Sequence, residues 1–355
     1  MDFTVNTYIN LLDALRQAGY TFLTFKEYMR IKSGIKEFGN RKSESKIHNR
    51  QDKVRSTEQD NRNQQHGERN KQHGDRNRTS SNMDPNHGIR EKENKSAIPG
   101  KGFSDINQNN KRKAVRDTNL LPPPQKFALL PHDVNALPEK FVILRHDVDE
   151  LPENSLRFAQ IQAEMGITGS FYFRIVPKSY NEAIIREIAK MGHEIGYHYE
   201  NMDFCHGNLN SAYKDFCNNL EKIRTVVPVE TICMHGSPRS GHDNRELWQK
   251  YNYRSLGITG EPYFDIDFNS VAYFTDTGRR WNGQKYSIRD KVKSNWHFDF
   301  RTTKQIIDNI NQLPHSIMFT FHPQRWTNNK ALWMKELVFQ NTKNIVKRFL
   351  YFFFL

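Results

Sequence analysis

The sequence predicts an α/β fold in which a parallel sheet, open or closed into a barrel, is covered by helices on its outside. Two observations predict it. From Phe141 onward, short apolar segments alternate with amphipathic helical patterns, which is typical of parallel strands joined by helical crossovers. The segment "FVILRHDV" is an apolar run that ends in polar residues, as expected for a central strand buried on both faces.

Residues 1–35 are predicted to form an N-terminal helical segment that packs on the following domain. The apolar residues of "MDFTVNTYINLLDALRQAGY" recur at helical spacing, and Gly19 offers a C-terminal stop. The segment "TFLTF" and a short helix to about Lys32 follow. Asp2 stands where an export signal carries basic residues, so we expect no such signal and a cytoplasmic protein.

Residues 36–135 are predicted to form a disordered, basic insertion rich in Asn, Arg and Gln. From Arg41 to Thr118 the chain holds 19 Lys or Arg, 11 Asp or Glu, and no Leu, Trp or Tyr. So few apolar residues cannot offset the entropy that ordering would cost. The segment carries 8 of the net charge of +13, so the remainder is only mildly basic and nucleic acid is not an expected partner. The alternative to a solvated insert is a flexible arm that docks on nucleic acid or anionic lipid.

The rest of the chain, residues 136–355, is predicted to form one domain. Strands are expected at "FVILRHDV", "TGSFYFRIV", "EIGYHY", "ETICMHG", "VAYFTD" and "SIMFTFH". Helices are expected at "LPENSLRFAQIQAEMG", "SYNEAIIREIAKMG", "NLNSAYKDFCNNLEKIRTV", "TTKQIIDNINQL" and from about Lys330 onward.

The cysteines and the C-terminus exclude two further classes of protein. The three cysteines are odd in number and match no CxxC spacing, which argues against a disulfide framework or a zinc knuckle. The apolar end "RFLYFFFL" has eight residues, whereas a transmembrane helix needs about 20. We therefore expect no transmembrane segment there, but the end of a helix packed on the domain or on a partner.

Four of the predicted strands end in side chains that can bind a metal or move a proton. These side chains are His146, Asp147 and Asp149, then His198 and Glu200, then His235, and finally His322. The carboxyl ends of parallel strands lie on one face, so residues far apart in the sequence would meet there. Any one of these histidines alone is more often structural, but their convergence predicts a functional site.

The chemistry that suits such a set of residues is metal-assisted hydrolysis. Imidazole and carboxylate ligands suit zinc and other first-row divalent ions, and a catalytic site keeps one position open. Asp147 and Asp149 are two apart in a strand and point to the same side. One of them can bind the metal while the other accepts a proton, and a histidine across the pocket can protonate the leaving group.

The motifs "RHDVD", "GHEIGYH" and "FTFHP" resemble those of the polysaccharide deacetylase family, the NodB-like carbohydrate esterases, over roughly Phe141 to Trp326. The resemblance implies a distorted (β/α) barrel. It further implies that Asp147 is the catalytic base and that His322 is the general acid. Asp149 and His198 would bind the metal, which is zinc in this interpretation.

The segment "TDTGRRW" loosely resembles a late motif of the same family. By that resemblance Asp276 would orient the general acid, and Trp281 would form a wall of the sugar pocket. The family's arginine that pairs with the base is not evident in "MHGSPRS", so Arg145, Arg279 or Arg280 would supply that charge. We group Arg145, Asp276, Arg279 and Trp281 as the substrate-binding side of the predicted site.

The sequence also departs from the family at one metal ligand. The family's second metal histidine stands four residues after the first, and here that position is Met202. His235 is the favoured third ligand because imidazole best replaces imidazole, with Glu200 as the substitute and His206 as a loop alternative. His193 would point away from His198 in an extended strand, so we interpret it as structural.

The resemblance implies a metal-dependent hydrolase that removes an N-acetyl group from an amino sugar or a glycan precursor. In a cytoplasmic protein the substrate would be a small N-acetylated sugar or a lipid-linked intermediate rather than an extracellular polymer. One alternative is a degenerate member that keeps the barrel and binds carbohydrate or protein without catalysis. Another is a hydrolase of a different non-peptide C–N bond, and a third is a scaffold acting through the basic insertion.

Overall fold

The computed structural model describes residues 1–34, 136–236, 241–282 and 291–354, with side chains in the last helix as far as Lys343. Within these residues the strands form one seven-stranded parallel sheet. They are β1 (Thr21–Leu23), β2 (Phe141–Val148), β3 (Ser170–Phe173), β4 (Glu194–Tyr199), β5 (Ile232–Met234), β6 (Ala272–Thr275) and β7 (Ser316–Phe321). Their order is β5-β4-β3-β2-β7-β6. Strand β1 is not part of this order and pairs with β2.

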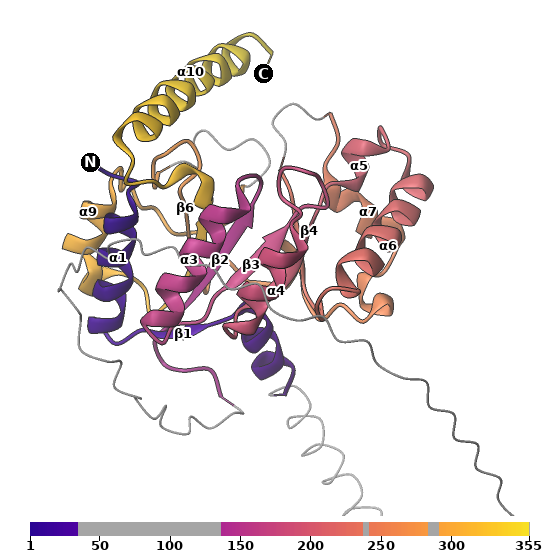
Figure 1. Cartoon of the computed structure of the whole chain (residues 1–355), viewed down its shortest axis with the longest axis horizontal. Coiled ribbons are helices and arrows are strands. Elements are labelled where there is room, and N and C mark those ends of the chain that lie inside the picture. The colour runs from indigo at the N-terminus through magenta and orange to yellow at the C-terminus, as the bar shows by residue number, and fades with distance from the viewer. Residues whose placement is uncertain (35–135, 237–240, 283–290, 355) are drawn as a thin grey trace, which may run out of the picture. The chain divides into compact units, whose positions relative to one another are not determined.

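Helices connect the strands and cover the sheet (Figure 1). They are α1 (Val5–Gln17), α3 (Pro152–Glu164), α4 (Glu182–Lys190), α5 (Asn201–Phe204), α6 (Leu209–Arg224), α7 (Leu247–Lys250), α8 (Pro262–Asp265), α9 (Thr303–Asp308) and α10 (Lys330–Phe354). A further helix spans residues 25–34. The α/β fold predicted from the sequence is confirmed, and the sheet curls into an incomplete barrel with β5 and β6 at its two edges.

The predicted elements after the insertion agree closely with those observed. Strands β2 and β4 have the predicted bounds, while β3, β5, β6 and β7 are shorter than their predicted segments. The four-residue helices α5, α7 and α8 have no counterpart in the prediction because so short a segment carries no periodic signal. The predicted insertion at 36–135 lies outside the described residues.

The N-terminal segment contributes both a helix and a strand to this domain. Helix α1 begins with a capping box at Thr4 and buries one face, which belongs to the larger hydrophobic cluster of the domain. Strand β1 then pairs with residues 141–143 of β2, and β3 pairs with residues 145–148 on the same edge. The first and second halves of β2 therefore have different neighbours.

The side chains of β2 alternate between two hydrophobic clusters, because successive residues of a strand point to opposite faces. Val142 and Leu144 belong to the larger cluster, which contains residues of α1 and α3. Phe141 and Ile143 belong to the smaller cluster, which contains inner residues of β3, β5 and β7. By this alternation Arg145 and Asp147 share the side of Phe141, whereas His146 faces α1 and α3.

His146 is accordingly a structural residue of the core. It is fully buried, and its Nδ1–H donates to the carbonyl of Ser170 at 3.1 Å. That bond leaves Nε2 as an acceptor, and the Tyr8 hydroxyl at 3.0 Å and the Gln162 amide at 2.9 Å both donate to it. The neutral ring thus joins α1, α3 and β3. Burial lowers the pKa of His146 from 6.5 to about 3, because the cation would lose its water.

We predict that this histidine makes the protein sensitive to acid. Its pKa is lowered on folding, so its contribution to stability is complete above pH 6.5 and is lost as the pH falls from 6.5 towards 3. The loss amounts to about 1.4 kcal/mol per pH unit within that window. Unfolding free energies from urea titrations at several pH values would measure it. The variant His146→Gln should show a shallower slope between pH 6 and pH 4, and equal slopes would contradict the assignment.

Candidate metal and catalytic site

The register of the sheet brings the polar strand ends together. Val148 is aligned with Phe173, so Asp149 and Arg174 follow side by side at the ends of β2 and β3. Tyr199 is aligned with Met234, which places Glu200 next to His235 at the ends of β4 and β5. We call six residues at the ends of β2, β4, β5 and β7 the strand-end cluster: Asp147, Asp149, His198, Glu200, His235 and His322. All six side chains are at least four-fifths buried.

Asp147 is held by Arg145, the residue two positions earlier on the same face of β2. The guanidinium donates to both carboxylate oxygens, at 2.8 Å from Nε and 2.6 Å from Nη2, and both side chains are almost completely buried. Of the arginines proposed to pair with the predicted base, Arg145 is therefore the one that does so. Its guanidinium also lies over the ring of Tyr263, 5.2 Å from the centroid.

Asp149 lies at the centre of the cluster. Its Oδ1 is 3.6 Å from Nε2 of His198 and 3.7 Å from Nε2 of His235. Its Oδ2 accepts a hydrogen bond from the Gln324 amide at 3.0 Å and lies 3.9 Å from Nε2 of His322. Oδ1 is buried and has no hydrogen-bond partner among the described residues. A bound cation would satisfy a buried carboxylate oxygen that faces two imidazole nitrogens in this way.

Both imidazoles are oriented through their other nitrogen. Nδ1–H of His198 donates to the backbone carbonyl of Cys233 at 2.9 Å, so its Nε2 is free to act as a ligand. Nδ1 of His235 lies 2.9 Å from Oε2 of Glu200, which leaves its Nε2 directed at Asp149. An oxygen acceptor bound to the other ring nitrogen, as at His198, is usual for metal-binding histidines. At His235 the Glu200 oxygen is close to Nδ1 but the contact lacks hydrogen-bond geometry.

Glu200 supports His235 and is not itself in the position of a ligand. Arg174 donates to both of its carboxylate oxygens at 2.7 Å, so the carboxylate is already bound on both sides. Arg174 also donates to the backbone carbonyl of Asp149 at 3.2 Å. The Arg174–Glu200 ion pair therefore contacts both the ring of His235 and the backbone at Asp149. The structure favours His235 over Glu200 as the third ligand.

His322 is bound by Asp276. Nδ1 of His322 lies 2.5 Å from Oδ1 of Asp276, and the backbone N–H of His322 donates to Oδ2 at 2.9 Å. The Trp326 indole and the Arg325 guanidinium also donate to the same carboxylate. With Nδ1 held in this way, Nε2 is the nitrogen that faces Asp149 and the site.

The carboxylates of the cluster are ionised in spite of their burial. Burial raises a carboxyl pKa, but Arg145 and the nearby histidines outweigh it and hold the pKa of Asp147 below its usual value. In the same way, the surrounding imidazoles overcome burial and hold the pKa of Asp149 well below its usual value. His235 shows the reverse effect, because Glu200 and Asp149 overcome burial and raise its pKa.

Three of these residues fit a zinc site. Donors bound at about 2.0–2.2 Å in a tetrahedral shell stand roughly 3.3–3.6 Å apart. The separations from Asp149 Oδ1 to Nε2 of His198 and His235 are 3.6 and 3.7 Å. One carboxylate and two imidazoles also leave a fourth position open, as in catalytic zinc sites. Asp149 Oδ1 could therefore share such an ion with either imidazole, and an ion held by all three residues would require the two imidazoles to converge on it.

Two groups of three donor residues have all their donor atoms within 4.8 Å of one another in the described part of the chain: Asp147, His198 and Cys233, and Glu200, Asp203 and His235. The first is less suitable because Arg145 already donates to both oxygens of Asp147. The second depends on Glu200, whose oxygens are occupied by Arg174.

The structure corrects the roles predicted for Trp281 and Arg279. Trp281 is 3% exposed, and its indole donates to Thr303 within an aromatic core, so it is no wall of a pocket beside His322. Arg279 has a left-handed backbone with φ 57°. Its guanidinium lies between the rings of Phe3 and Trp333, away from Asp147.

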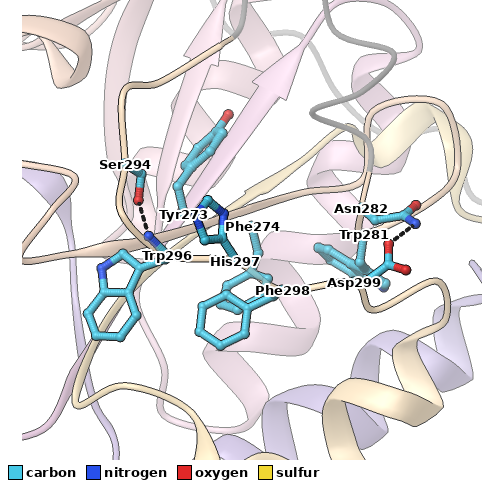
Figure 2. A pocket seen from close by; sticks show the side chains of 9 residues that line it. All are labelled: Tyr273, Phe274, Trp281, Asn282, Ser294, Trp296, His297, Phe298 and Asp299. Atoms are coloured by element: carbon cyan, nitrogen blue, oxygen red, sulfur yellow. Dashed lines mark hydrogen bonds between the residues drawn. The ribbon is translucent and has the colours of Figure 1, made fainter.

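The edge of Trp281 instead lines a separate cavity of about 300 Å³ beside β6 (Figure 2). Its other lining residues are Tyr273, Phe274, Asn282, Ser294, Trp296, His297, Phe298 and Asp299, and none of them belongs to the strand-end cluster. Figure 2 shows the rings of Trp296 and Phe298 next to each other, and they stack with centroids 6.0 Å apart.

Sequence reasoning missed two residues that contact the cluster, Arg174 and Gln324. Arg174 directly follows β3, so the strand-end rule that found the other residues would also have found it. Gln324 belongs to a short 3₁₀ turn after β7, where no periodic signal exists. The residue interpreted as structural, His193, is indeed bound in the core, between the carbonyl of Ala159 and the N–H of Gly169.

The Glu200→Gln variant is expected to weaken zinc binding by about 10- to 100-fold, because the carboxylate that orients His235 loses its charge. Competition with a chromophoric chelator would measure the dissociation constant. Glu182→Gln is a matched control, since Glu182 forms an exposed ion pair with Arg186. An unchanged affinity would contradict the orienting role, and complete loss of binding would instead make Glu200 a ligand.

No protein-family model and no curated protein matches this chain. Among solved structures it is similar to a family 4 carbohydrate esterase from Bacillus anthracis, with 14% identity, a TM-score of 0.31, and coverage of 57% of this chain and 74% of that chain. A family 4 pseudoenzyme from the same organism is also similar, with 13% identity, a TM-score of 0.34, and coverage of 59% of this chain and 61% of that chain. The Xyl-CE4 domain of a multidomain xylanase from the hindgut metagenome of Trinervitermes trinervoides has 15% identity, a TM-score of 0.27, and coverage of 56% of this chain and 92% of that chain. Similarities at these TM-scores support no conclusion about function, which has to come from the site residues.

Proposed function

We propose that this chain is a divergent polysaccharide deacetylase, a metal-dependent hydrolase that removes the N-acetyl group from an amino sugar or a glycan precursor. The observation that supports it best is the arrangement around Asp149. One carboxylate oxygen faces two imidazoles, a second carboxylate stands beside them on Asp147, and a third imidazole faces them from His322. Metal-assisted amide hydrolysis uses ligands, a base and an acid of these kinds.

Asp147 is the proposed general base. Arg145 keeps it ionised and fixes its orientation, and its Oδ2 is 3.8 Å from Nε2 of His198, next to the proposed ligands. It takes the proton from a water molecule, whose oxygen then attacks the carbonyl carbon of the acetamide. A divalent ion such as zinc, when bound by Asp149, His198 and His235, polarises that carbonyl and stabilises the developing negative charge.

His322 is the proposed general acid. Asp276 accepts the hydrogen bond from Nδ1–H and stabilises the charged ring, so that the second proton is carried on Nε2. As the C–N bond breaks, Nε2 gives this proton to the departing amine. The products are a free amino sugar and acetate. The proton taken up by Asp147 and the proton lost by His322 are then exchanged with solvent.

The test combines metal content with product analysis. The protein would be purified without chelator, and elemental analysis is expected to find about one equivalent of zinc or a similar ion per chain. Incubation with N-acetylglucosamine and with short chitin oligomers is then expected to release acetate and free amine in equal amounts. EDTA should stop the release and added zinc should restore it. Absence of metal after reconstitution, together with absence of acetate, would exclude the hydrolase and leave a barrel that binds without cleaving.

A further inference from the structure

We propose that α10 docks on the surface of a membrane that contains anionic lipids. The helix is drawn in yellow in Figure 1. The structure describes nine large hydrophobic side chains as exposed, and four of them lie within eight residues of α10. They are Leu332, Met334, Val338 and Phe339, each between 52% and 58% exposed. A concentration of exposed apolar side chains on a helix marks an interaction surface.

The charges on the outer side of α10 identify the partner. Lys330, Lys335 and Lys343 are exposed between and beside the apolar residues. The only acidic residue from 330 to 343 is Glu336, which is not among the exposed residues. Burial raises its pKa. The outer side thus combines apolar contact with positive charge alone, the combination that binds anionic headgroups.

Among the described residues, the inner side of α10 contacts the domain chiefly through Trp333, whose ring lies under the Arg279 guanidinium. The Trp333 indole donates to the backbone carbonyl of Asp2 at 2.6 Å, and Gln340 is buried. A helix of 25 residues usually gains its stability by burying one apolar face along its length. In the segment from 330 to 343 most side chains are exposed instead, so a second surface is needed to cover them.

A bilayer surface is favoured over the two other partners of an apolar helix. No helix in the described residues is long and apolar enough to cross a membrane. A second copy of the helix would bring exposed lysines of equal charge towards each other. The sequence after the described side chains continues the same composition, with Lys347 and Arg348 followed by "FLYFFFL".

Vesicle sedimentation of the full chain tests this proposal. Binding to phosphatidylcholine vesicles containing about one third phosphatidylglycerol is expected to be at least about tenfold tighter than to phosphatidylcholine alone, and to weaken with salt. The double variant Leu332→Glu/Phe339→Glu should lose at least about tenfold in affinity, because it places two charges in the apolar contact. The control Leu151→Glu/Phe204→Glu changes two residues that are equally exposed elsewhere, and should bind normally.

Two results would overturn the proposal. One is equal binding of the wild type and the α10 variant to anionic vesicles. The other is a concentration-dependent dimer, seen by light scattering, that the same α10 variant dissociates while vesicles bind weakly. Deacetylation of a water-soluble sugar is expected to be unchanged in the α10 variant, since neither residue belongs to the strand-end cluster. Failure of the membrane proposal would therefore leave the proposed activity unaffected, and failure of the activity would leave the membrane proposal unaffected.

Discussion

Replacing Asp149 by alanine is expected to abolish metal binding and to lower kcat/KM for N-acetyl sugars by at least about 1,000-fold. Both His198 and His235 face the Asp149 carboxylate. Its removal takes away one proposed ligand and the negative charge that lies between the other two. Loss of metal chemistry removes several kcal/mol of transition-state stabilisation, and each 1.4 kcal/mol corresponds to a factor of ten in rate. His198→Ala should have the same effect.

Metal analysis and acetate release would be measured on the same preparations. His315→Ala is the control for loss of a histidine outside the cluster, because its side chain is 63% exposed. Circular dichroism and thermal melting would show that the variants are folded. If Asp149→Ala retained a full equivalent of zinc, the ligand assignment would be wrong. If it lost the metal but kept its activity, the hydrolase mechanism would be wrong while the metal site stood.

The strand ends were predictable from the sequence because they follow from two simple rules. An apolar run that turns polar marks where a parallel strand leaves the sheet, and all such ends lie on one face. This reasoning placed Asp147, Asp149, His198, His235 and His322 together, and the structure confirms that they meet. The period of two within a strand likewise predicted that Asp147 and Asp149 share a side.

The preference for His235 over Glu200 as third ligand came from ligand chemistry alone, and the contact between the two residues was not predictable because it depends on contacts across strands. The alignment of Tyr199 with Met234 decides that the two side chains are neighbours. The bidentate bond from Arg174 on the next strand decides that Glu200 supports the histidine. A single sequence contains the residues of such a network but not the register that connects them.

The predictions failed in the segment after β6, where the chain follows no periodic pattern. Asp276, which the resemblance assigned to orient His322, directly follows β6 and contacts His322. Arg279 has a left-handed backbone in the turn that follows β6. After this turn the side chains of Arg279 and Trp281 both contact Phe3 of the N-terminal segment, and Trp281 belongs to the aromatic core. A motif matched loosely by spacing could not anticipate this change of direction.

The proposed base and its arginine also form a buried ion pair, so changing Asp147 affects both rate and stability. Asp147→Asn keeps the shape of the side chain but leaves Arg145 buried without a counter-charge. Removing one partner of a buried pair typically costs about 3–5 kcal/mol of folding free energy. Adding Arg145→Met removes the uncompensated charge, and the double variant is therefore expected to recover most of the lost stability, as measured by urea unfolding.

Activity is expected to behave differently from stability in this series. Loss of the general base should lower kcat by about 100- to 10,000-fold in Asp147→Asn, with about one equivalent of metal still bound. The double variant Arg145→Met/Asp147→Asn should stay equally inactive although it is more stable, because the missing group is the proton acceptor itself. Recovery of kcat in the double variant would show that Asp147 serves only to neutralise Arg145. Loss of metal from Asp147→Asn would instead move Asp147 into the ligand set beside His198, whose Nε2 lies 3.8 Å from it.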